Sequence, residues 1–154
     1  MEADRSRRDV LAAGVVAAAA SGVPSTAWTV ARGGDVLAGA RAAGAMVLPG
    51  ERRTMPLLAA AVPVHLALSI GWAFVLGSVL PARREPLFGT VAGLAIAALD
   101  LGLVGRRIPA IREVEQLPQW LDHAAYGFAV GTVLHQRHAA RAPAEAPRAP
   151  AREP

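Results

Sequence analysis

The sequence contains neither cysteine nor lysine. The absence of cysteine excludes disulfides, thiolate metal sites and iron–sulfur clusters. Because lysine is missing, all sixteen basic residues are arginine. Together with the abundance of alanine, glycine and proline, this bias indicates the codon usage of a high-GC bacterium.

Recognisable catalytic motifs are also missing. The glycines form no phosphate-binding loop, and the sequence has neither a serine nucleophile elbow nor the helix of a zinc protease. His135 and His138 have a helical metal-ligand spacing, but they lie in a basic stretch that we interpret as a solvated helix end. The sequence therefore predicts a protein that is not an enzyme and that binds no metal or cofactor.

The distribution of positive charge argues against nucleic-acid binding. The net charge of +4 would by itself allow a nucleic-acid partner. However, the arginines fall in short clusters at the ends of apolar blocks, which is typical of the flanks of membrane helices. We therefore expect the lipid bilayer as the main partner, with a second copy of the chain or another membrane protein as further candidates.

Apolar residues make up 53% of the chain and are gathered into long blocks. The clearest block, residues 57–80, carries no charge and would extend about 36 Å as a helix, more than a hydrocarbon core of about 30 Å. The next block, residues 87–104, has Asp100 as its only charge and follows after a short turn, which predicts an antiparallel hairpin. A shorter block, residues 120–134, has Asp122 near its start, where a carboxylate suits the positive end of a helix dipole.

The N-terminal block allows two interpretations. It is apolar but interrupted at Gly22-Val23-Pro24, so it can form a broken membrane span. Alternatively, Arg7 and Arg8 with the following apolar stretch resemble a twin-arginine export signal, cleaved after Ala27. Arginine pairs also commonly precede a first membrane helix, and strong spans follow here, so the broken span is the leading interpretation.

These patterns predict an all-α, polytopic bundle in the bacterial cytoplasmic (inner) membrane. Asp35 is the expected N-cap of the first of two short interfacial helices. The arginines slightly favour both termini on the cytoplasmic side. The predicted organisation is a basic cytoplasmic N-terminus at 1–9, a membrane domain at 10–134 with spans at about 10–31, 56–80, 87–105 and 119–135, interfacial helices at about 35–48 and 108–117, and a disordered tail at 139–154.

The ionisable residues inside the predicted spans are the candidates for a functional site, because each is costly in a membrane without a partner. Counting the helical rise from the shared turn places His65 and Asp100 at similar depth, with His123 and Tyr126 nearby. The group can fix helix register by hydrogen bonding, or it can form a proton or ion relay or a polar small-molecule site. A third interpretation is a b-type haem held by His65 and His123.

Small residues recur on single faces of two predicted helices. Faces of this type let helix backbones approach closely. The candidate helix-packing residues are Gly89, Gly93 and Ala97 on one helix and Gly127 and Gly131 on the other.

The segment AALDLGLVGRRIPAIREVEQLPQWLDHAAYGFAVGTVL at 97–134 resembles a recurring pattern in small multi-pass membrane proteins of high-GC actinobacteria. The segments GVPST at 22–26 and RAAG at 41–44 are similar as well. The resemblance implies that the N-terminal block belongs to the membrane domain, and it implies no catalytic residue.

Two functions from different classes follow from these observations. The first is a non-enzymatic membrane module whose small-residue faces pack helices within or between chains. The alternative is a small transport or proton-transfer protein that uses Asp100 with His65 and His123.

Overall fold

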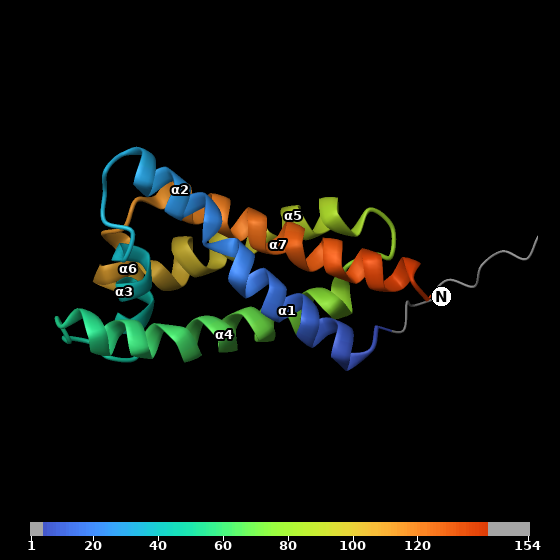
Figure 1. The fold of residues 1–154 in the computed structure, drawn as a ribbon, viewed down its shortest axis with the longest axis horizontal. Helices are drawn as coiled ribbons and strands as arrows, with labels where there is room; N and C mark the ends of the chain where they lie inside the picture. Colours follow the sequence, from blue (N-terminus) through green and yellow to red (C-terminus); the bar gives the residue numbers. More distant parts are fainter. Residues whose placement is uncertain (1–4, 142–154) are drawn as a thin grey trace, which may run out of the picture.

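The computed structural model describes residues 5–141, which form an elongated helical bundle without a strand in this part of the chain (Figure 1). Both ends of the described segment lie at one end of the bundle, called here the terminal end. The opposite end, with the connections at 32–37, 46–53 and 108–115, is called the loop end. The elements are α1 (Arg7–Ser21), α2 (Val23–Ala31), α3 (Ala38–Ala45), α4 (Thr54–Val79), α5 (Glu85–Leu99), the π-helical turn η1 (Asp100–Val104), the 3-10 turn η2 (Gly105–Arg107), α6 (Pro109–Arg112) and α7 (Gln116–Ala139).

Within residues 5–141, three helical segments are long and apolar enough to cross a membrane. They are Arg7–Ala31, which contains α1 and α2, then α4, and then Glu85–Arg107, which contains α5, η1 and η2. Each overlaps one of the predicted spans. The fourth predicted span, 119–135, lies within α7, which is not among these three segments.

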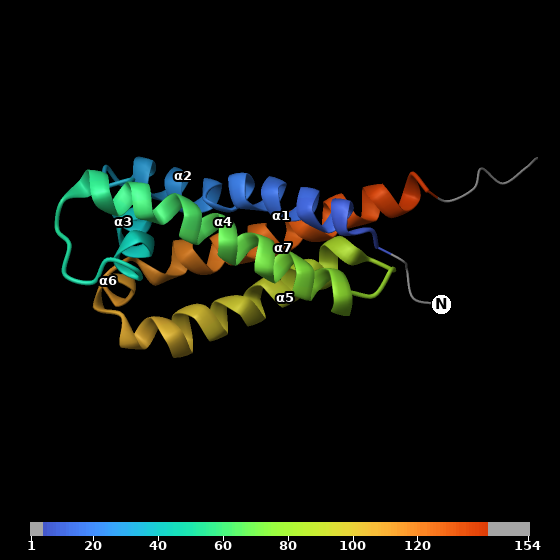
Figure 2. The same ribbon diagram turned by 90° about the horizontal axis from the view of Figure 1, so that it is seen from below.

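Helix α7 runs through the middle of the bundle. It packs against α1 and α2 on one side and against α5 on the other, as Figures 1 and 2 show. α4 packs mainly on α1 and α3. The short turn between α4 and α5 is present as predicted, but the two helices diverge from it and pack on different neighbours.

Glycines hold the helices close together. A Cβ atom added at Gly89 or Gly93 would clash with the backbone of α7, and one added at Gly127 or Gly131 would clash with the backbone of α5 or its start. In the same way, a Cβ on Gly44 of α3 would clash with the backbone of α4. These helices therefore touch backbone to backbone, which leaves no room for larger side chains.

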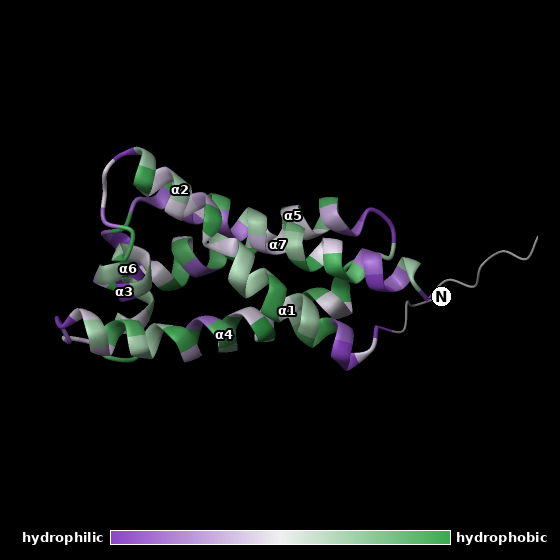
Figure 3. Ribbon diagram, viewed as in Figure 1, coloured by the Kyte–Doolittle hydropathy of each residue, from purple (hydrophilic) through white to green (hydrophobic). Residues whose placement is uncertain are grey.

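Small side chains lie at the closest helix contacts, larger ones such as Leu76 and Leu134 complete the interior, and many other large apolar side chains face outward. Ala13, Ala17, Ala73 and Ala97 are fully buried. In contrast, bulky residues such as Val79, at 65% exposure, lie on the outside of the bundle. Figure 3 shows the result: apolar helices between two polar ends. Apolar surface of this extent is typical of a surface that another apolar phase or partner covers.

The connections at the loop end differ in detail from the prediction. The helix expected at 35–48 is α3, which begins only at Ala38, so Asp35 is not its N-cap. Instead, the Asp35 carboxylate accepts a hydrogen bond from the Leu37 N–H and pairs with Arg41, and the Arg41 hydrogen bond lowers the pKa of Asp35. The other predicted interfacial helix, 108–117, contains the short α6 and the first two residues of α7.

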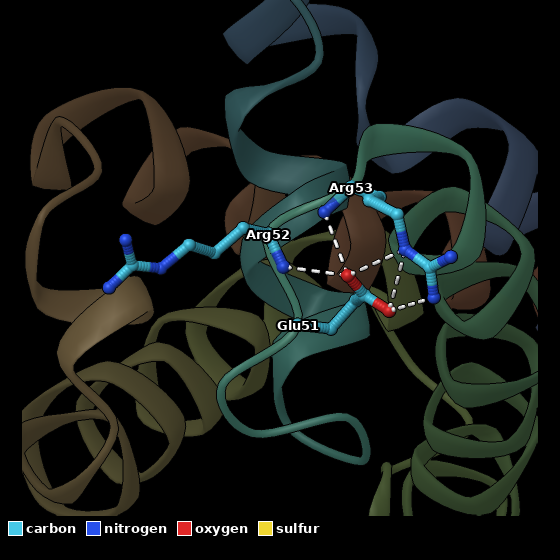
Figure 4. Close-up of polar contacts among 3 residues, drawn as sticks. All are labelled: Glu51, Arg52 and Arg53. Carbon is cyan, nitrogen blue, oxygen red and sulfur yellow. Dashed lines mark hydrogen bonds and ion pairs between the residues drawn. The ribbon is translucent and has the colours of Figure 1, made fainter.

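The residues just before α4 form a compact charged turn (Figure 4). The Arg53 side chain binds both carboxylate oxygens of Glu51, and Glu51 Oε1 also accepts the N–H groups of Arg52 and Arg53, at 2.8 and 2.9 Å. These bonds, led by the Arg53 side chain, lower the pKa of Glu51 to about 2. The Glu51 carboxylate thus keeps its negative charge beside the first residues of α4.

Candidate functional site

The break between α1 and α2 is contacted by polar side chains from two other helices. Pro24 has no N–H, so the last carbonyls of α1 and the first N–H groups of α2 lose some of their helical partners. The Ser25 N–H donates a hydrogen bond of 2.8 Å to Oδ1 of Asp122, which comes from α7. A carboxylate thus stands at the positive end of α2, where the helix dipole favours it.

A second side chain reaches the carbonyl side of the same break. His65 of α4 donates a hydrogen bond of 2.9 Å from Nε2 to the Ala18 carbonyl, because that carbonyl can only accept. The Ser21 hydroxyl bonds to the same oxygen at 3.4 Å. Side chains from α4 and α7 therefore satisfy the two sides of the interrupted helix.

Of the predicted site residues, Asp100 and His123 lie next to each other. Asp100 begins the π-helical turn η1, and its Oδ2 lies 3.6 Å from Nε2 of His123. The other ring nitrogen of His123 donates to the Gln119 carbonyl at 2.8 Å. Nε2 therefore carries a proton only when the imidazole is charged, so the contact is an ion pair only in that state, and at 3.6 Å it is too long for a hydrogen bond.

Tyr126, the fourth predicted site residue, bonds elsewhere. Its hydroxyl donates to the Ser69 carbonyl of α4 and is buried. Tyr126 thereby ties α7 to α4 at a place where few other contacts join these two helices.

The predicted cluster is therefore split into three separate contacts. Asp100 meets His123, whereas His65 is turned toward α1 and Tyr126 toward the backbone of α4. A haem held by His65 and His123 would need both rings to face one space, and the geometry does not provide this. Among residues 5–141, no group of three histidine, aspartate or glutamate side chains is arranged to hold a metal ion.

Polar contacts at two places in the bundle were not predicted from the sequence. Asp122 was assigned to the dipole of its own helix, but its hydrogen bond goes to α2. At the terminal end, the fully buried Glu85 binds Arg5 at 2.7 Å, and His135 Nδ1 lies 3.3 Å from its other oxygen. Arg5 also donates to the Gly77 carbonyl at 2.8 Å, so this one side chain joins the ends of α4 and α5. The only sequence signal for Glu85 was its place at the start of a helix, where an acid is favourable.

The site offers a limited chemistry. It contains carboxylates and imidazoles that can hold or move a proton, and backbone-bound side chains that fix helix positions. Most of its polar atoms already have partners within the chain, which favours a structural task.

Comparison of the chain with protein-family models, with curated proteins and with solved structures gives no match. The resemblance to small membrane proteins of actinobacteria therefore stays a prediction.

Proposed function

We propose that this protein is a non-enzymatic integral membrane protein of the bacterial cytoplasmic membrane, whose chain crosses the bilayer four times. The observation that carries the proposal is the distribution of side chains: glycine and alanine lie at the closest helix contacts, and many large apolar residues are exposed on the outside of the bundle. Lipid tails are as apolar as leucine, so close packing and polar contacts must hold membrane helices together. The glycine faces and the bonds at the helix break supply both.

The central position of α7 supports the fourth crossing. Its 24 residues would extend about 36 Å, enough for a hydrocarbon core of about 30 Å. Its hydropathy is low because it contains polar residues such as Asp122, His123 and Tyr126, and the side chains of these three contact α2, η1 and α4. Polar residues of a membrane helix are tolerated where they face the interior of a bundle.

The contacts of α1 support retention of the N-terminal segment. Val10, Ala13 and Ala17 belong to the buried core, and Ala18 and Ser25 provide the partners of His65 and Asp122. Cleavage after Ala27 would remove all of them and leave two polar side chains of the bundle without partners. We therefore favour a broken first span over an export signal.

The role that this arrangement supports best is that of a helix-packing module. Gly89, Gly93, Gly127 and Gly131 are already occupied by contacts between α5 and α7 of one chain. Any further partner would therefore meet the outward faces, which carry large apolar side chains.

Single-cysteine labelling tests the four crossings, because the chain has no cysteine of its own. Exposed positions 36 and 113 lie at the loop end, and exposed positions 7, 83 and 140 lie at the terminal end. With a membrane-impermeant maleimide in intact cells, we expect Val36→Cys and Glu113→Cys to be labelled, and Arg7→Cys, Arg83→Cys and Ala140→Cys only after permeabilisation. Labelling of positions 113 and 140 from the same side would refute a crossing by α7.

Proton transfer is the second candidate function, and the Asp100–His123 pair at the π-helical turn favours it. π-helical turns occur frequently at functional sites, and a carboxylate beside an imidazole can exchange a proton. In liposomes with an internal pH dye, this function predicts proton flux that Asp100→Asn abolishes and Tyr126→Phe retains. Wild-type flux no greater than that of empty liposomes would leave the packing module as the function.

A further inference from the structure

An apolar groove with a volume of about 520 Å³ runs along the outside of the bundle between α1–α2 and α7. Val16, Ala20 and Pro24 line one wall, and Ala125, Ala129 and Val133 line the other. The alanines keep the groove open, because a larger side chain at these positions would fill it. The groove follows the helix axes, so it would lie parallel to the acyl chains of a surrounding bilayer.

The dimensions of the groove limit what can occupy it. From Ala125 to its last lining residue on α7, Gln136, it extends about 16 Å at about 1.5 Å per residue. The lining is apolar over this length, so a single hydrocarbon chain fits along the groove.

One mouth of the groove opens among positive charges. Gln136 lies at the terminal end, next to the exposed Arg137, and the N-terminal residues Arg7 and Arg8 are exposed at the same end. Within residues 5–141, none of these three arginines takes part in an ion pair. The nearby carboxylates are neutralised, since Asp9 pairs with Arg141 and Glu85 with Arg5. The mouth therefore presents unbalanced positive charge to a headgroup.

We propose that this groove binds an anionic phospholipid, with one acyl chain between α1–α2 and α7 and the phosphate at Arg137. The inference rests on the membrane placement proposed above. Basic side chains at the cytoplasmic surface attract anionic lipid by about 1 kcal/mol each, which is about fivefold in affinity. The acyl chain adds apolar contact that a free phosphate would lack.

Native mass spectrometry of the full chain in mild detergent tests the proposal. The probes are dioleoyl phosphatidylglycerol, which is anionic, and dioleoyl phosphatidylcholine, which is not. We expect the anionic lipid to bind more tightly, and Arg137→Gln to weaken it about fivefold but phosphatidylcholine less, because the choline ammonium offsets the charge of the phosphate. Arg112→Gln, at the opposite end, is the matched control and should change neither lipid.

A second pair of variants tests the acyl-chain contact. Ala20→Leu adds bulk inside the groove, whereas Ala19→Leu adds the same bulk at an exposed neighbour that does not line it. We expect only Ala20→Leu to weaken both lipids. Circular dichroism of each variant establishes that it is folded, and Arg137→Gln changes an exposed side chain.

Several outcomes would overturn the proposal. Equal affinity for the two lipids, or no effect of Arg137→Gln, would do so. A dimer that Ala20→Leu dissociates would show instead that a second copy covers the groove. Failure to bind either lipid, in a protein whose cysteine labelling shows four crossings, would overturn the lipid site and leave the proposed function standing. Recovery of the protein in the soluble fraction would overturn the membrane placement first.

Discussion

The buried pair of Arg5 and Glu85 gives the strongest prediction about stability. The Glu85 carboxylate is fully buried, the Arg5 side chain is 11% exposed, and the two atoms that pair are 2.7 Å apart. Removing one partner of a buried ion pair costs about 3–5 kcal/mol, because it leaves the other charge without compensation. Arg5→Met should fall near the lower limit, about 3 kcal/mol, since His135 remains close to Glu85.

Replacing both partners separates this effect from simple loss of packing. In Arg5→Met/Glu85→Leu no buried charge is left, and such replacements are often neutral or stabilising. The double variant still lacks the hydrogen bond from Arg5 to the Gly77 carbonyl, which is worth about 1 kcal/mol. We therefore expect the double variant to be more stable than Arg5→Met by about 2 kcal/mol.

Reversible unfolding in mixed micelles, followed by circular dichroism, measures these free energies of unfolding. Arg7→Met, at an exposed position in the same segment, is the matched control and should have little effect. The reasoning would be refuted if the double variant lost as much stability as the two single variants together, because the two charges would then act independently.

Three further predictions address the helix contacts, the turn before α4 and the helix break. Gly127→Ala should destabilise the protein by about 1–3 kcal/mol, because it places a Cβ against the backbone of α5. Gly71→Ala is the control and should not destabilise it, because the space around Gly71 is open. The same unfolding assay compares the two variants. The carboxyl carbon of Glu51, followed by NMR, should titrate near pH 2, and in Arg53→Gln the pKa of Glu51 should rise toward 4.5. In the wild type, the charged turn therefore stabilises the protein fully above about pH 4.5, and this contribution is lost as the pH falls through about 2. Asp122→Ala should destabilise more than Asp122→Asn, by about 1–3 kcal/mol, because only asparagine still accepts the N–H at the start of α2; equal losses in unfolding would contradict this.

The helices were predictable wherever apolar blocks are long and uninterrupted. The span expected at 56–80 corresponds to α4 at Thr54–Val79, because nothing polar breaks this block. The interruption at Gly22-Val23-Pro24 likewise separates α1 from α2. Helix α7 begins earlier than expected, at Gln116, because polar residues in its first turns do not follow the apolar pattern.

The lateral contacts were not predictable in the same way. Depth along a helix depends only on the rise per residue, and this placed His65 and Asp100 at similar levels. Which helices are neighbours depends on tertiary packing, and α4 packs on α1 instead of α5. His65 therefore bonds to Ala18 and not to Asp100, and the role of Asp122 at α2 depends on a break in another helix.

At Gly93, the contact between α5 and α7 and the position of the Asp100–His123 pair depend on each other. This limits which variants can distinguish the two candidate functions. A Cβ on Gly93 would clash with the carbonyl of His123, so the contact at Gly93 sets the position of the residue that pairs with Asp100. A bulky substitution at Gly93 would push α7 away and disturb the ion pair at the same time. Loss of activity in such a variant would be compatible with either function. Asp100→Asn removes the charge and leaves the glycine contact intact, so only this change separates proton transfer from helix packing.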